Sequence, residues 1–161
     1  NVVFGLNCWN MLRNSGDTRA AVVDDCKDIA ALNSENDLRL NVTQIRRFIE
    51  NDLTHFTILI LNERLKGFAI SGGFVADEIT LMHILISPDQ RKRGLGRKLL
   101  TDNLCFWREK GAKRCLLEMR MSNNEAKSSY TKLGFAVDGF RPNYYLTDNF
   151  REDAILMSLS L

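Results

Sequence analysis

The sequence predicts a single α/β domain built on a mixed central sheet, and two observations carry that prediction. Three runs rich in Ile, Leu, Phe and Thr, at residues 55–61, 65–74 and 78–86, are separated only by short polar turns. Such runs form an antiparallel meander. A long helical pattern at 94–111 then leads into a strand-like run at 113–119, which predicts a parallel strand–helix–strand crossover. Helices should therefore flank a mixed sheet.

Shorter elements lie on both sides of this centre. A short strand is expected at 19–23, followed by a helix that Asp24 or Asp25 can cap. A second helix is expected at 43–51, with Thr43 as its N-cap. The remaining predicted elements are a helix at 124–133 and two closing strands at 135–141 and 154–161.

The composition limits the functional classes. The chain has 161 residues, 45% of them hydrophobic and 26% charged, which is typical of one globular domain. Its formal net charge of +2 is too small to indicate a nucleic-acid-binding protein. Charged or polar residues interrupt every apolar run before it reaches the ~18–20 residues of a membrane helix. We therefore expect a cytoplasmic protein without nucleic-acid or membrane partners.

The four cysteines and two histidines offer little for a metal site or a disulfide framework. The cysteines show no C-x-x-C spacing, and neither histidine lies at zinc-finger distance from them. We expect reduced thiols and no bound metal. Residues 1–16 lack the basic region and long apolar run of a signal peptide. They are treated as an N-terminal extension of unclear role, and residues 17–161 as the domain.

The most informative segment follows the run at 78–86. A buried strand ends, a polar turn follows, and Gly94 and Gly96 open the long helix. Such a turn presents backbone N–H groups at the positive end of the helix dipole, and glycine lets a phosphate approach the backbone closely. The segment also carries five basic side chains: Arg91, Lys92, Arg93, Arg97 and Lys98. This pattern indicates a phosphate-bearing ligand, although a solvated basic helix start fits the same residues.

Two common phosphate-binding motifs do not fit this segment. The P-loop pattern G-x-x-x-x-G-K-[ST] does not match it, and Leu99 occupies the place of the third glycine in G-x-G-x-x-G. The preceding strand is also the last of a meander rather than the first of a dinucleotide-binding unit. Neither a nucleotide triphosphatase nor a dinucleotide-binding domain is therefore indicated.

The same turn resembles the acetyl-coenzyme A loop, R/Q-x-x-G-x-G/A, of the GNAT superfamily of N-acetyltransferases. In that superfamily the loop follows a strand and opens a long helix, as it does here. The runs at 118–123 and 130–135 look like the second half of the same core. The runs at 141–145 and 151–154 resemble the bacterial ribosomal-protein-alanine N-acetyltransferases, which acetylate the α-amine of a protein N-terminus. The resemblance extends over nearly the whole chain.

The resemblance implies roles for individual residues. Glu118 matches the general base, Tyr130 matches the general acid, and Asn123 would contact the cofactor near the catalytic centre. Tyr144 and Tyr145 would form a wall of the peptide cleft, although packing at the rim of the sheet also fits them. The implied acetyl-CoA contacts lie on the strand and its following loop: Ile84, Leu85, Ile86, Lys92, Arg93, Gly94, Leu95, Gly96 and Arg97.

The implied reaction is the direct attack of an amine on a thioester, and these residues suit it. An α-amine has a pKa of ~7.7–8.0, against ~10.4 for a lysine side chain, so one carboxylate at Glu118 suffices as the base. A tyrosine hydroxyl, with a pKa of ~10, can protonate or hydrogen-bond a leaving thiolate whose pKa is ~8.5. A backbone donor near Leu85 would stabilise the oxyanion. The acceptor implied is a protein or peptide N-terminus, such as that of a ribosomal protein, starting with alanine or another small residue.

Other functions stay open on the sequence. A small-molecule amine or a lysine side chain is the alternative acceptor, because one scaffold hosts many acceptors. A non-catalytic coenzyme A-binding module is a further alternative, although Glu118 and Tyr130 argue against it. RNA binding through the basic turn would need stacking aromatic residues, which the turn lacks. His83 is either part of the acceptor site or an ordinary strand histidine.

Overall fold

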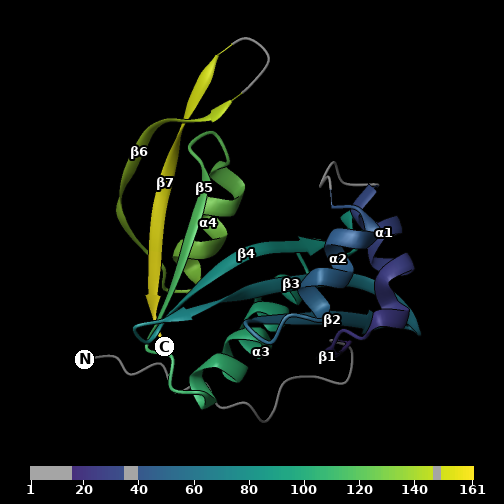
Figure 1. Ribbon diagram of the computed structural model, residues 1–161. Helices are drawn as coiled ribbons and strands as arrows, with labels where there is room; N and C mark the ends of the chain where they lie inside the picture. The colour runs from purple at the N-terminus through teal and green to yellow at the C-terminus, as the bar shows by residue number, and fades with distance from the viewer. Residues whose placement is uncertain (1–15, 35–39, 147–149) are drawn as a thin grey trace.

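The computed structural model describes residues 16–34, 40–146 and 150–161, and over these residues the chain forms a seven-stranded mixed sheet. The strand order is β1-β2-β3-β4-β5-β7-β6 (Figure 1). The strands are β1 (Asp17–Ala20), β2 (Thr54–Leu61), β3 (Arg64–Val75), β4 (Glu78–Ile86), β5 (Arg114–Arg120), β6 (Ala136–Leu146) and β7 (Arg151–Ser160). Only β4 and β5 pair in parallel; every other pair among the described strands is antiparallel. The predicted meander and the predicted crossover are both confirmed.

Helices cover both faces of the first half of the sheet (Figure 1). On one face lie α1 (Cys26–Ser34) and α2 (Val42–Ile49), and on the other lies α3 (Leu95–Glu109). The alternation of side chains along each strand explains this arrangement. Ile58 and Phe68 are fully buried against α1 and α2, whereas the neighbouring Leu59 is fully buried against α3.

The second half of the sheet has helical cover on one face. The helix α4 (Asn124–Lys132) contributes Ala126 and Tyr130 to a core formed with Leu117 and Met119 of β5. The opposite face of β5 carries Glu118 and polar contacts between strands. The two halves of the sheet therefore differ in how deeply they are covered.

The parallel pairing of β4 and β5 is short. It comprises Glu78 with Arg114, Ile79 with Cys115 and Thr80 with Leu116, after which the two strands diverge (Figure 1). Beyond this point β4 pairs on its other side with β3 alone, so the edge of β4 at residues 84–86 faces an opening. The divergence creates the space in which the candidate site lies.

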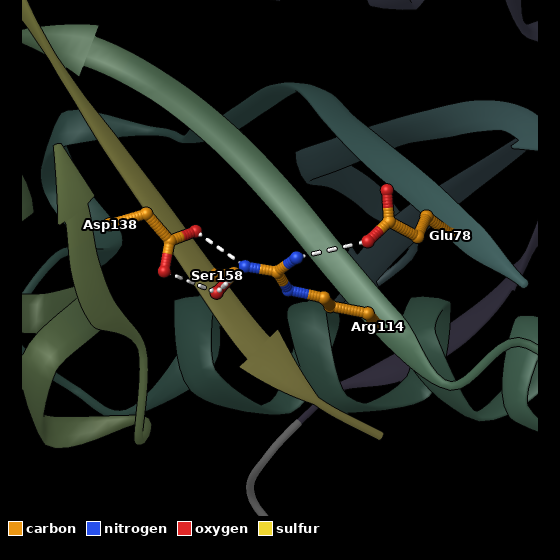
Figure 2. Close-up of polar contacts among 4 residues, drawn as sticks. All are labelled: Glu78, Arg114, Asp138 and Ser158. Carbon is orange, nitrogen blue, oxygen red and sulfur yellow. Dashed lines mark hydrogen bonds and ion pairs between the residues drawn. The ribbon is translucent and has the colours of Figure 1, made fainter. Parts of the chain in front are cut away.

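A cluster of polar side chains ties the strands together where the opening closes (Figure 2). The Arg114 guanidinium contacts Glu78 of β4 at 3.0 Å and Asp138 of β6 at 2.8 Å. It also donates a hydrogen bond to the Ser158 hydroxyl of β7 at 3.0 Å. One side chain thus joins four strands at the vertex of the divergence.

The strand β4 contains a bulge beside the opening. Ile70 of β3 pairs with His83, but the next residue, Ser71, pairs with Leu81, so Met82 is the extra residue. A bulge of this kind bends the strand and increases its twist. It therefore adds to the divergence of β4 from β5.

Several predicted boundaries are wrong. The first strand is Asp17–Ala20 rather than 19–23, and a 3-10 turn at Val23–Asp25 precedes α1. Val22 is the N-cap of that turn, while Asp25 accepts a hydrogen bond from the Val22 amide at 2.8 Å.

The N-cap of α2 is Asn41 rather than Thr43. Asn41 and Gln44 exchange side-chain-to-backbone hydrogen bonds of 2.9 Å in a capping box. This reciprocal pair satisfies the backbone amides of Asn41 and Gln44. The helix therefore begins at Val42, before the residue that the sequence suggested as its cap. The proposed extension at 1–16 lies outside the described residues except for its last member.

Candidate active site

The loop between β4 and α3 is the anion-binding loop predicted from the sequence. A short turn at Pro88–Gln90 follows β4, and Gly94 is the N-cap of α3 with a φ of +79°. Lys92 also adopts a left-handed conformation, with a φ of +60°. The first amides of a helix have no acceptor within it and are available to a ligand. Gly94 thus has a backbone conformation that favours glycine, and the first amides of α3 begin beside it.

A large cavity of about 570 Å³ lies beside this loop. Its walls are the end of β4, the loop with the start of α3, and one side of α4. Nine of the residues predicted to bind cofactor or to act in catalysis line it: Ile84, Leu85, Ile86, Lys92, Gly94, Gly96, Arg97, Asn123 and Tyr130. The structure thus brings the strand, the loop and α4 together around one space.

Two of the predicted cofactor contacts do not line the cavity. Leu95 is buried against Leu59 and Ala69 in the core, whereas Arg93 is exposed and its guanidinium donates a hydrogen bond to Gln90 at 2.5 Å. A contact from Leu95 would have to use its backbone amide, as expected for a helix N-terminus.

A second, smaller cavity of about 200 Å³ lies between the diverging strands. Glu118 and His83 line it from β5 and β4. Both cavities share four lining residues, which are Ile84, Asn123, Ala126 and Tyr130. The two spaces therefore adjoin each other, with Tyr130 between them.

Glu118 is held by an ion pair from the edge strand. Its carboxylate lies 3.1 Å from the Arg141 guanidinium of β6, and 31% of the Glu118 side chain is exposed. Strand alternation places Glu118 on the face of β5 opposite Leu117 and Met119. Glu118 thus lines the small cavity from the polar face of the sheet, and its side chain has access to solvent.

Tyr130 enters from the other side. Its ring packs edge-on against Phe135, with centroids 5.5 Å apart. Burial raises the pKa of Tyr130 to about 12, so the hydroxyl keeps its proton at neutral pH. A protonated hydroxyl between the two cavities can donate a hydrogen bond or a proton.

The remaining predicted residues surround these two. Asn123 is the N-cap of α4, and its side-chain oxygen accepts a hydrogen bond from the Ala126 amide at 3.1 Å. Burial lowers the pKa of His83, so that its imidazole is neutral near pH 7.

The two tyrosines of β6 stack on arginines of the same surface. The Arg141 guanidinium lies 4.7 Å from the Tyr144 ring centre, and Arg120 lies 4.6 Å from that of Tyr145. Burial, with the nearby charge of Glu118, raises the pKa of Tyr145. Tyr145 therefore lies near the candidate base, whereas Tyr144 is 46% exposed.

Sequence reasoning missed two residues of this arrangement. Ala126 lies between Asn123 and Tyr130 at helical spacing, a signal that would have placed it on the same side of α4. The Arg141–Glu118 pair carries no comparable signal, because it depends on how β6 and β5 align across β7.

A family model described as an acetyltransferase (GNAT) domain matches residues 52–137, more than half of the chain. The chain belongs to the GNAT acetyltransferase family. The matched segment includes β4, the anion-binding loop, α3, β5 and α4, which are the elements that line both cavities. GNAT acetyltransferases use acetyl-CoA as a co-substrate, and the predicted fold and enzyme class are confirmed.

Curated GNAT relatives include bacterial protein N-acetyltransferases. The chain is 41% identical over 103 residues to the [ribosomal protein bS18]-alanine N-acetyltransferase of Escherichia coli K12, covering 64% of this chain and 69% of that protein. It is 34% identical over 113 residues to a putative enzyme of the same name from Bacillus subtilis, covering 70% and 73%. The crystal structure of the ribosomal-protein-S18-alanine N-acetyltransferase from E. coli matches with a TM-score of 0.81 and 29% identity, covering 90% of this chain and 93% of that one.

Two further findings concern metals and membranes. The described residues contain no group of three or more His, Cys, Asp or Glu side chains that could hold a metal ion. None of the described helices is both long enough and apolar enough to span a membrane.

Proposed function

We propose that this chain transfers the acetyl group of acetyl-CoA to the α-amine of a protein N-terminus that begins with alanine or another small residue. A ribosomal protein similar to bS18 is the proposed acceptor, since the E. coli relative with 41% identity is named for that reaction. The observation that carries the proposal is the junction of a large and a small cavity at Tyr130, with Glu118 in the small one.

The large cavity suits the donor. The edge of β4 at residues 84–86 offers main-chain groups to an extended amide-containing arm, in the manner of an added strand. The loop before α3 offers amides and the basic residues Lys92 and Arg97 to a diphosphate. When bound, acetyl-CoA supplies an activated acetyl thioester, and the chain's residues orient it toward the small cavity.

Glu118 is the proposed general base. An amine attacks only when neutral, and an α-amine needs little help because its pKa is ~7.7–8.0. Glu118 accepts the proton directly or through one water molecule, and its partial exposure leaves a path for that proton to solvent. Arg141 holds the carboxylate in place before the acceptor arrives.

Tyr130 is the proposed general acid. Because its pKa is about 12, it holds a proton until a thiolate forms beside it. Donation of that proton to the thiolate, after which Tyr130 regains a proton from solvent, releases the free thiol and completes the transfer without a covalent enzyme intermediate. A backbone N–H near Leu85 is the proposed donor to the oxyanion.

The small cavity is proposed to bind the first residue of the acceptor. This cavity, of about 200 Å³, is much smaller than the large one, and we propose that it favours a small first residue. Tyr144 and Tyr145 are proposed to form the wall past which the rest of the peptide leaves. We further propose that residues 17–161 form the acetyltransferase domain, that the protein acts in the cytoplasm, and that it makes no direct contact with nucleic acid.

An acceptor panel tests the proposal. The purified chain is supplied with acetyl-CoA and one of three acceptors: an Ala-starting peptide, the same peptide with a blocked α-amine and an internal lysine, or a polyamine. We expect acetylation of the first alone, and slower transfer when Phe or Lys replaces the first Ala. Efficient modification of the blocked peptide would favour a lysine acetyltransferase. A preference for the polyamine would favour a small-molecule acceptor.

A further inference from the structure

The loop before α3 is organised around a carboxylate that does not line the cavity. Asp89 accepts hydrogen bonds from the Lys66 ammonium of β3 at 2.8 Å, from the Gln90 side-chain amide at 2.8 Å and from the Ser87 hydroxyl. Its neighbours Gln90, Arg91 and Lys92 do line the large cavity. Asp89 thus lies behind the residues that would meet the ligand.

The contacts of Asp89 continue across the loop. The Gln90 side chain that donates to Asp89 also accepts from Arg93 at 2.5 Å. A chain of side chains therefore runs from Lys66 through Asp89 to Arg93. This segment includes Lys92, whose left-handed φ of +60° is unfavourable for a residue with a Cβ atom and needs support from its surroundings.

Charge alone would disfavour an acidic residue at this place. A carboxylate behind an anion-binding loop repels a phosphate, and Asp89 is ionised at neutral pH, since the hydrogen bonds from Lys66 and Ser87 lower its pKa below the already acidic ordinary value. Lys66 neutralises that charge from the adjacent strand. The Lys66 charge thereby weakens the repulsion between Asp89 and a bound phosphate, while the hydrogen bonds that Asp89 accepts from the loop remain.

We propose that Asp89 and Lys66 are positioning residues that hold the loop at residues 90–97 in the shape that receives the donor's diphosphate. This inference rests on the proposed function, because it assigns the large cavity to acetyl-CoA. Asp89 touches neither donor nor acceptor in this proposal. It acts through the backbone of the loop.

Two donors separate positioning from general stability. S-acetyl-pantetheine carries the same thioester as acetyl-CoA but no phosphate. In Asp89→Ala we expect the KM for acetyl-CoA to rise about tenfold, as for the loss of a charged hydrogen-bonded pair, with little change in kcat. The KM for S-acetyl-pantetheine should stay at the wild-type value. Calorimetry with coenzyme A and pantetheine measures the same split without turnover.

Two further variants test the pairing. Lys66→Met should raise the KM for acetyl-CoA in the same direction, and Lys66→Met combined with Asp89→Ala should be no worse than Asp89→Ala alone. Lys113→Met is the matched control, because it removes another Lys–Asp pair, 2.6 Å long, at the opposite end of β4. It should leave both donors unaffected.

The outcomes are distinct. An unchanged KM for acetyl-CoA in Asp89→Ala would overturn the inference. A lower KM would overturn it as well, because the repulsion between the Asp89 carboxylate and the diphosphate would then matter more than the support that Asp89 gives the loop. Equal losses with both donors would overturn it too, since only stability would be affected. If the wild-type protein used both donors equally well, the large cavity would not hold a diphosphate, and the proposed donor site would fall together with this inference.

Discussion

The two halves of the sheet differ in cover and in chemistry. Strands β1 to β4 lie between helices on both faces, and their central residues, such as Phe68 and Ile70, are fully buried. Strands β5 to β7 are covered by α4 on one face, and most residues of β6 are exposed. The deeply packed half supplies the main-chain groups proposed for the donor, while the more open half supplies Glu118 and Tyr130.

Buried polar contacts fix the first half as firmly as its apolar core. Asn103 of α3 is fully buried; its side-chain oxygen accepts a hydrogen bond from the Ser71 hydroxyl at 2.5 Å, and its side-chain nitrogen donates one to the Thr57 hydroxyl at 2.9 Å. Trp107 donates to the same Ser71 hydroxyl at 2.7 Å. A satisfied network of this kind specifies one packing of α3 on the sheet. The anion-binding loop at the start of α3 is thus carried by a helix with a fixed position.

The second half has ion pairs on its polar face instead. Arg120 pairs with Glu152, whose side chain is only 12% exposed. Arg141 pairs with Glu118, whose side chain is 31% exposed. The more open Arg141–Glu118 pair contributes only about 0–1 kcal/mol, so it can rearrange at small cost. If the proposed sites are right, the loop that would receive the donor's diphosphate lies on the rigid half, and the proposed acid–base residues lie on the more adaptable one. Substitutions in the two halves should therefore give different kinetic signatures.

The largest expected effect is on chemistry in the open half. Glu118→Gln and Tyr130→Phe should each lower kcat by roughly 10²–10⁴-fold, as for a lost general base or acid. The KM for acetyl-CoA should change little, because Glu118 does not line the large cavity and Tyr130→Phe keeps the aromatic ring there. Steady-state kinetics with an Ala-starting peptide measure both quantities. Wild-type rates in both variants, with chemistry rate-limiting, would place the acid–base site elsewhere.

The order of the elements was predictable, whereas the opening between β4 and β5 was not. Strand runs and the helix with Leu99 and Leu100 on its buried side are local patterns that a sequence carries directly. The length of the parallel pairing and the bulge at Met82 depend on twist and on non-local register. The contact of Arg141 with Glu118 depends on the same register, so no local pattern predicted it.

A second expected effect is the acid sensitivity of the packed half. His55 stacks on Phe106 at 3.7 Å, and burial, with the nearby Lys110 charge, lowers its pKa from 6.5 to about 4. The folded protein therefore holds the neutral imidazole, while the unfolded chain binds a proton below pH 6.5. The contribution of His55 to the free energy of unfolding is fully present above pH 6.5. It falls by about 1–2 kcal/mol as the pH drops toward 4, after allowance for solvent screening.

Denaturant unfolding across this pH range measures that loss. His55→Gln should make the free energy of unfolding less dependent on pH. His83→Gln should have a smaller effect, because burial lowers the pKa of His83 as well but by less. Paired carboxylates such as Asp25, whose pKa is lowered by Arg19, lose their contribution only at lower pH. An unchanged slope in His55→Gln would show that the imidazole is not held neutral.

A third effect separates the donor loop from the rest of the packed half. Gly94 has a φ of +79° and no heavy atom within 4 Å of an added Cβ, so a substitution there changes backbone preference rather than packing. Gly94→Val should weaken coenzyme A binding by about 1–2 kcal/mol, since a β-branched residue disfavours the left-handed region. Gly94→Asn is the matched control, because asparagine tolerates that region, and it should bind nearly as wild type in calorimetry. Equal losses in both variants would mean that the side chain blocks the ligand instead.

The smallest expected effect concerns the vertex that joins the two halves. Arg114→Met removes the contacts with Glu78, Asp138 and Ser158 shown in Figure 2. The ion-paired side chains are 36–43% exposed, so the loss of stability should be about 1 kcal/mol, or roughly 2–4 °C in Tm.

The same variant should affect the binding of the acceptor but not that of the donor. Because β5 would be held less firmly against β4, the KM for the acceptor peptide should rise about twofold to fivefold while the KM for acetyl-CoA stays constant. Arg46→Met, which breaks an exposed pair within α2, is the control and should change neither value. A rise in both KM values for Arg114→Met would show that the two halves respond as one unit, and the division of donor and acceptor functions between them would be wrong.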